Sequence, residues 1–171
     1  IFAAVAVVLC LLQAHGLRLL QLAPVWAALA LALALVLPVL VWNAQHQWVS
    51  FAYQANHGAG GGWALREVLR FLLVQVVVFG PLLLAVVVGW RHAPRALRPL
   101  GWFFALPFVV LAYLSGGGTS LPHWTAPAWV TLAPFAGLAL ANRWASGARL
   151  LPQALVLLQL LACVALPAAM L

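Results

Sequence analysis

Long apolar runs alternate with short polar interruptions along the whole chain. Hydrophobic residues dominate six stretches, at about 1–14, 24–42, 69–89, 100–114, 125–141 and 151–171. A helix needs about 20 apolar residues to cross the roughly 30 Å hydrocarbon core of a bilayer. The pattern therefore predicts an all-α, polytopic integral membrane protein with about six transmembrane helices.

The two outermost runs are expected to be truncated spans. The first run is short, and the last stops inside apolar sequence at Leu171. The chain begins without the basic segment and cleavage site of a signal peptide. We interpret residues 1–171 as a single transmembrane helical domain that is a piece of a longer chain. Within it, Gly80 and Pro81 should kink the third span unless neighbouring helices satisfy the freed carbonyl group.

Composition indicates the same class of protein. Hydrophobic residues make up 67% of the chain and charged residues 5%, with a mean hydropathy of +1.13. Soluble domains contain roughly 45–50% apolar and 25% charged residues. The net charge of +7 comes from eight arginines and one acid, Glu67. The arginines are scattered, which argues against nucleic acid as a partner. Cys10 and Cys163 lie in apolar runs and do not indicate a disulfide.

The arginines also predict orientation, because cytoplasmic loops near span ends are enriched in Lys and Arg. The first, third and fifth connections carry one, three and two arginines, whereas the second carries two and the fourth none. This asymmetry places loops 43–66 and 115–124 on the extracytoplasmic side.

Polar side chains gather in these two loops together with several aromatic ones, and polar side chains are otherwise rare. The richest stretch is 38–57, PVLVWNAQHQWVSFAYQANH. Two interpretations are open: a binding site, or an interfacial belt in which Trp and Tyr rings lie at the level of the lipid headgroups. His46, His57 and His123 do not indicate a metal site, since the first two are eleven positions apart and no Cys or Asp stands nearby.

Arg66 and Arg70 are the candidates for phosphate binding. They lie one helical turn apart in the amphipathic stretch 63–70, and a guanidinium group can donate two hydrogen bonds to one phosphate. The headgroups of membrane lipids would satisfy them equally well, so both roles stay open. Glu67 most simply offsets their charge.

Two segments resemble motifs of a known family. Residues 38–54, PVLVWNAQHQWVSFAYQ, resemble the pattern P-x-x-x-W-N-x-x-H-x-W-x-S-F-x-x-Q, and residues 121–129, LPHWTAPAW, resemble P-[HN]-W-x-x-P-[AG]-[YW]. Both patterns belong to bacterial polytopic glycosyltransferases of the GT-C class, the family of aminoarabinose transferase and protein O-mannosyltransferase. The two segments come in the family's order and on one predicted face, and the resemblance covers most of the chain.

The resemblance implies a membrane enzyme that transfers a sugar from a polyprenyl-phosphate carrier to a lipid or protein acceptor. The reaction would take place on the extracytoplasmic face of the bacterial inner membrane. The matching positions, which would shape the substrate pocket, are Trp42, Asn43, His46, Trp48, Gln54, Pro122, His123 and Trp124.

The chain departs from the family pattern in its acidic and basic residues. The family's catalytic acid belongs to an outer loop near the N-terminus that this sequence does not contain. We therefore expect no catalytic residue, cofactor or metal in this segment, and a divalent metal in the full-length enzyme stays open. Residues 118–120, Gly-Thr-Ser, stand where relatives often carry a basic residue, which leaves phosphate contacts to Arg66, Arg70 and histidine.

Two other functions remain open. A non-catalytic membrane scaffold would assemble with another chain that carries the acidic residues. A small transporter would place polar residues near mid-membrane at broken helices. Within the predicted spans, Gln75, Gly80 and Pro81 are the residues that fit such a path, and spans this plain argue against one.

Overall fold

The computed structural model describes residues 2–58, 62–117 and 122–168, and all regular structure in these ranges is helical. The prediction of an all-α protein is confirmed. In chain order, with 3₁₀ helices written η, the elements are α1 Phe2–His15, η1 Gly16–Gln21, α2 Ala23–Gln45, α3 Val49–Gly58, α4 Leu65–His92, η2 Arg95–Leu97, α5 Leu100–Ser115, η3 Pro122–Thr125, α6 Ala126–Val130, α7 Ala133–Ala145 and α8 Leu150–Ala168.

The length and composition of the helices are those of a helical membrane protein. Four segments in the described ranges are long and apolar enough to cross a bilayer: Phe2–Gln21, Ala23–Gln45, Leu65–His92 and Arg95–Ser115. A fifth span results if His123–Val130 and Ala133–Ala145 act together, with a bend of 55° between them. The apolar part of α8, Leu150–Val164, is shorter. The structure thus supports four or five of the six predicted spans.

The predicted fifth span is the clearest difference from expectation. Where the sequence predicts one helix over 125–141, α6 ends at Val130 and α7 begins at Ala133. Pro134 lies in the first turn of α7, and a proline has no N–H to continue a helix from the preceding turn. The outward loop predicted at 43–66 also differs, since it contains α3 and the start of α4.

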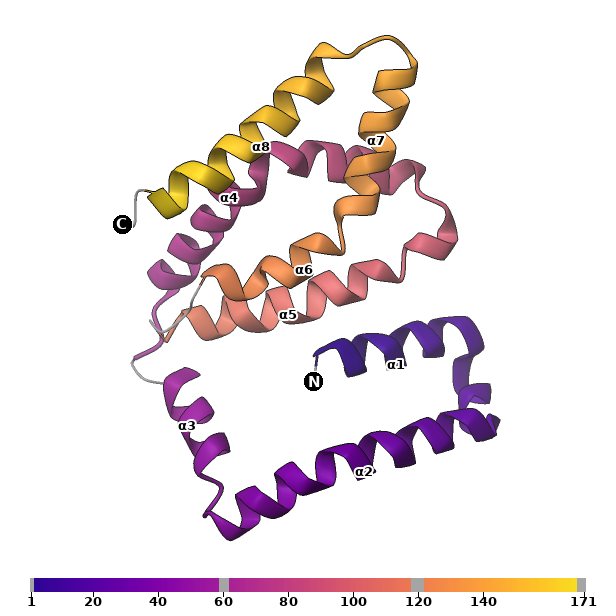
Figure 1. Cartoon of the computed structure of the whole chain (residues 1–171), viewed down its shortest axis with the longest axis vertical. Helices are drawn as coiled ribbons and strands as arrows, with labels where there is room; N and C mark the ends of the chain where they lie inside the picture. Colours follow the sequence, from indigo (N-terminus) through magenta and orange to yellow (C-terminus); the bar gives the residue numbers. More distant parts are fainter. Residues whose placement is uncertain (1, 59–61, 118–121, 169–171) are drawn as a thin grey trace.

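α4 is the helix against which α5, α7 and α8 all pack (Figure 1). Its contact with α7 uses small residues: Ala85 of α4 lies in a buried cluster with Ala136 and Ala139. One turn further on, a Cβ atom on Gly89 would overlap the main-chain carbonyl of Phe135. Small residues let two helix backbones approach closely, which is how many membrane helices associate.

α4 changes direction part-way along its length (Figure 1). The predicted cause, Pro81, lies inside the helix. Close to it, the side-chain nitrogen of Gln159 on α8 donates a 2.6 Å hydrogen bond to the carbonyl oxygen of Val78. The carbonyl that Pro81 leaves without its helical donor is that of Val77, four positions earlier, so the bond from Gln159 reaches the neighbouring carbonyl and links α8 to α4 at the bend.

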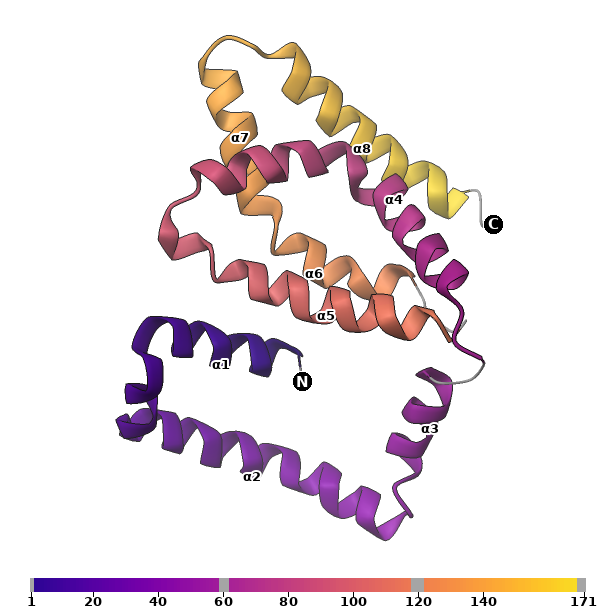
Figure 2. The same ribbon diagram turned by 180° about the vertical axis from the view of Figure 1, so that it is seen from behind.

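The connections between helices gather at two ends of the molecule (Figures 1 and 2). The α2–α3 turn, the start of α4, the end of α5 and η3 lie at one end, here called the motif end. The α1–α2, α4–α5 and α7–α8 connections lie at the other, here called the arginine end, because these connections carry Arg18, Arg91, Arg95, Arg98, Arg143 and Arg149.

Candidate functional site

The α2–α3 turn holds the first group of predicted site residues. The rings of Trp42 and His46 are stacked, with centroids 4.2 Å apart and planes inclined by 14°. His46 Nδ1 lies 2.7 Å from the carbonyl oxygen of Trp42, to which its N–H donates a hydrogen bond. In the neutral histidine, Nε2 is then the free acceptor. Trp42 and Trp48 are about half exposed and His46 is exposed, so these three rings can meet a ligand.

Asn43 has a different place in the same turn, since its side chain is 1% exposed. Its Nδ2 donates to the carbonyl oxygen of Val39 at 3.0 Å, and its own carbonyl accepts from the N–H of Trp48 at 2.8 Å. Its Oδ1 is buried and has no hydrogen-bond partner among the described residues. Asn43 therefore stabilises the end of α2, and the ring groups form the accessible part of the turn.

Two residues of the turn have unusual backbone angles. Gln47 and Trp48 have φ values of 54° and 57°, in the left-handed region that costs a residue with a Cβ about 1–2 kcal/mol. The bond from Trp48 N–H to Asn43 closes the turn across them. This strain lies at the last two positions of the W-N-x-x-H-x-W segment, and strained backbone is found more often at functional sites than elsewhere.

The start of α4 holds the predicted phosphate-binding arginines. Arg66 forms an ion pair with Glu67, with Nε and Oε1 3.0 Å apart, and its side chain is 86% exposed. Arg70 is exposed one turn later. Just before them, Trp63 Nε1 donates to the Tyr113 carbonyl at 3.0 Å, and the backbone N–H of Ala64 donates to Gly116 at 2.9 Å. These two bonds tie the arginine-bearing turn to the end of α5.

The second group lies on η3, where His123 and Trp124 are exposed. Both residues line a mostly apolar cavity of about 670 Å³ between η3, α1, α5 and α6. The other walls come from residues such as Phe2, Phe103 and Leu111. A histidine and a tryptophan at the edge of an apolar cavity offer a polar group, an aromatic face and a slot for a hydrocarbon chain.

A buried hydrogen-bond network, not predicted as part of the site, holds this second group. Gln75 Oε1 accepts hydrogen bonds from Thr125 Oγ1 at 2.6 Å and from Trp129 Nε1 at 2.8 Å. Gln75 and Thr125 are 1% and 0% exposed. The indole of Trp129 also stacks on Phe79, with ring centroids 4.6 Å apart. Gln75 stood out in the sequence as an amide in an apolar span, where a polar group needs a partner, but its partners lie about 50 positions away.

The predicted aromatic and histidine residues thus form two groups at the motif end, and Arg66 and Arg70 lie between them in the chain, at the start of α4. No described hydrogen bond or ring contact joins Trp42 or His46 to His123 or Trp124. α3 runs from the α2 turn toward the start of α4 (Figure 1). The side chains of Gln54, His57 and Pro122 lie outside the described part of the structure.

Metal binding receives no support from the described ranges. No group of three His, Cys, Asp or Glu side chains that could hold a metal ion occurs there. The divalent metal that the family resemblance leaves open stays a prediction.

No protein-family model, curated protein or solved structure matches the chain.

Proposed function

We propose that the chain forms the carrier-lipid-binding part of a membrane glycosyltransferase. The enzyme would transfer a sugar from a polyprenyl-phosphate carrier to a lipid or protein acceptor on the extracytoplasmic face of the bacterial inner membrane. The observation that carries the proposal is the apolar cavity edged by His123 and Trp124, at the same end of the helices as Arg66, Arg70 and the α2–α3 turn.

The chemistry of these groups matches a lipid-linked sugar phosphate. An isoprenoid chain is apolar, so burying part of it in the cavity between α1, α5 and α6 is favourable. Histidine and arginine donate hydrogen bonds to phosphate oxygens, and a bond to a charged group is stronger than one between neutral groups. The exposed tryptophans offer flat surfaces for the apolar face of a sugar ring.

The proposed reaction is a direct displacement. The acceptor hydroxyl attacks the anomeric carbon, the bond from that carbon to the phosphate oxygen breaks, and a general base takes the hydroxyl proton. Polyprenyl phosphate leaves with the electron pair of the broken bond, and cationic side chains stabilise the charge that develops on it. We assign no base within the chain, whose one acid, Glu67, is paired with Arg66.

Carrier binding by the purified protein in nanodiscs tests the proposal directly. We expect His123→Ala to weaken polyprenyl-phosphate binding about tenfold, since a hydrogen bond to a charged group contributes about 1.5–3 kcal/mol. His92→Ala is the control, because His92 is an exposed histidine like His123 but lies at the arginine end.

Transfer from a polyprenyl-phosphate sugar by the full-length enzyme, compared in wild type, His46→Ala and His123→Ala, tests the catalytic part of the proposal. Unchanged transfer in both variants would remove these histidines from the site. Wild-type protein that binds polyprenyl phosphate no better than a polyprenyl alcohol would contradict a phosphate-carrier site altogether.

A small transporter is the second candidate, favoured by one observation. The α6–α7 break, the Pro81 region of α4 and Gln159 of α8 border a cavity of about 290 Å³, and transporters place substrate sites at such discontinuities. Movement of a labelled polyprenyl-phosphate sugar between the leaflets of proteoliposomes, without transfer to an acceptor, would favour this function over the first.

A further inference from the structure

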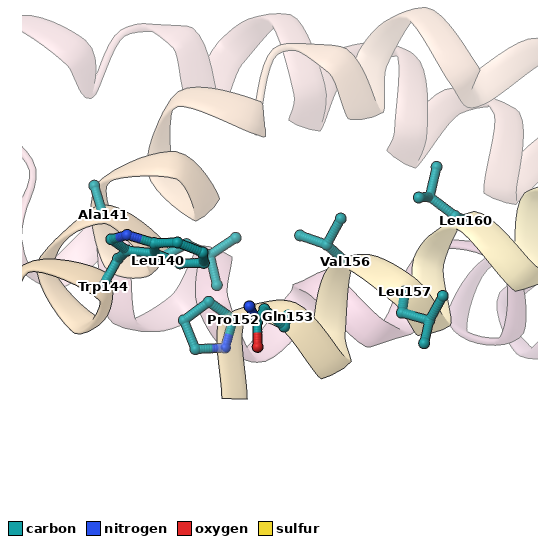
Figure 3. Close-up of a pocket in the computed structure, with 8 residues that line it drawn as sticks. All are labelled: Leu140, Ala141, Trp144, Pro152, Gln153, Val156, Leu157 and Leu160. Atoms are coloured by element: carbon teal, nitrogen blue, oxygen red, sulfur yellow. The ribbon is translucent and has the colours of Figure 1, made fainter. Parts of the chain in front are cut away.

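A second groove lies at the opposite end of the molecule from the candidate site. α7 and α8 diverge from a tight turn at the arginine end (Figure 1), and a cavity of about 430 Å³ lies between them. Leu140 and Trp144 of α7 face Gln153 and Val156 of α8, and Leu160 continues the wall along α8 (Figure 3). The lining is almost wholly apolar, so the groove suits a hydrocarbon chain.

Two arginines, Arg143 and Arg149, lie at the turn that joins the two helices, and Arg149 contacts Trp144 of the groove lining. Gly147 has a φ of 85°, and the N–H of Ala148 donates to the carbonyl of Arg143 at 3.1 Å, which ends α7. The next residue, Arg149, lies over the ring of Trp144, with its guanidinium carbon 5.5 Å from the ring centroid. Arg143 and Arg149 are both exposed.

These two charges have no acidic side chain in the sequence to balance them. The one acid of the chain, Glu67, belongs to the first turn of α4 at the motif end and pairs with Arg66. The first turn of α8 adds the positive end of a helix dipole and contains no acidic residue. A group of two arginines and a helix N-terminus attracts an anion, and that anion must come from outside the chain.

We propose that the α7–α8 groove binds one anionic phospholipid, with an acyl chain along the apolar wall and the phosphate beside Arg143 and Arg149. The proposal does not depend on the glycosyltransferase function. Basic pockets between membrane helices are a known way to bind anionic headgroups.

Native mass spectrometry of the delipidated protein measures the first bound lipid. Phosphatidylglycerol and phosphatidylcholine with identical acyl chains are titrated separately, and wild type should prefer phosphatidylglycerol. Arg143→Gln with Arg149→Gln should weaken phosphatidylglycerol binding about 25-fold, at about fivefold for each arginine. Phosphatidylcholine binding should weaken less, because the choline group of that lipid offsets the charge of its phosphate. The control is Arg95→Gln with Arg98→Gln, which removes two charges from the same end but away from the groove.

Two further measurements distinguish lipid bound in the groove from an anion held by charge alone. Val156→Trp should fill the groove without changing charge and weaken binding of the first lipid, while circular dichroism confirms that every variant is folded. Inorganic phosphate at millimolar concentration should not displace the lipid, because it cannot occupy the apolar wall. Equal binding by wild type and the Arg143–Arg149 variant, full binding by Val156→Trp, or displacement by phosphate would each overturn the proposal.

Discussion

Thr125 donates a 2.6 Å hydrogen bond to Oε1 of Gln75, which precedes it by 50 positions in the chain. Trp129 donates to the same oxygen atom at 2.8 Å. One acceptor on α4 therefore holds both the end of η3 and α6, the segment that presents His123 and Trp124 to the cavity. The position of these two side chains therefore depends on a buried contact with α4.

Replacing Gln75 with Leu should destabilise this contact. Leucine is similar in size to glutamine but has no oxygen to accept hydrogen bonds from Thr125 and Trp129. Leaving a buried donor without its acceptor costs about 1–3 kcal/mol. We expect a lower free energy of unfolding in a detergent-to-SDS titration. Gln13→Leu is the control, since Gln13 is exposed on α1. Equal stability of the two variants would contradict the importance of the network.

Substitutions at Thr125 distinguish the contribution of the hydrogen bond from that of packing. Thr125→Val keeps the shape of the side chain and removes the hydroxyl group, whereas Thr125→Ser keeps the hydroxyl group that donates to Gln75. We expect Thr125→Val to lose about 1 kcal/mol and to weaken carrier binding at His123, with Thr125→Ser retaining more of that binding. A reversed order in the binding assay would show that the methyl group, not the hydroxyl group, positions η3.

Gly89 should not tolerate any side chain. A Cβ atom there would overlap the carbonyl group of Phe135, so Gly89→Ala must push α4 and α7 apart, at a typical cost of about 1–3 kcal/mol for overpacking. Gly137→Ala on α7 is the matched control, because nothing lies within 4 Å of a Cβ built there. Alanine is the better helix former by about 0.5–1 kcal/mol, so the control should be neutral or stabilised in the SDS titration. Destabilisation of both variants to the same extent would mean that α7 itself, not its contact with α4, is sensitive.

The sequence was sufficient to predict the helical class, the approximate position of the long spans and the bend of α4 near Pro81, because these depend on local composition. It did not predict the break before α7, although Pro134 inside a predicted span was the available signal. α3 was missed because its polar and aromatic residues lack the long apolar run of a span.

Tertiary relationships account for the rest of the differences. Gln75, Thr125 and Trp129 meet only because α4 and α6 pack together. Gln159 lies inside the predicted last span, and its hydrogen bond to Val78 depends on how α8 crosses α4. Neither contact follows from the spacing of these residues in the sequence.

The α2–α3 turn offers a test of its backbone strain. Gln47 has a φ of 54°, and glycine adopts this region without the penalty of a Cβ. Gln47→Gly should stabilise the turn by about 1 kcal/mol, measured as slower amide hydrogen exchange at Trp48, whose N–H bonds to Asn43. Ala44→Gly, in the last turn of α2, should have the opposite effect. Faster exchange in Gln47→Gly would show that the side chain of Gln47 stabilises the turn by more than its strain costs.

Orientation in the bilayer is open to a direct labelling test. The arginine end carries six of the eight arginines, and positively charged connections are retained on the cytoplasmic side. A single cysteine at Ala55 on α3 should therefore react with a membrane-impermeant maleimide in intact cells, and one at Ala96 in η2 should react only after permeabilisation. Both positions are exposed, unlike Ala93, which is 6% exposed and would resist labelling on either side. Cys10 and Cys163 are replaced by serine beforehand. Labelling of Ala96→Cys in intact cells would place the candidate site on the cytoplasmic face. The sugar would then leave its carrier before the carrier crosses the membrane, and the proposal of transfer on the extracytoplasmic face would be wrong.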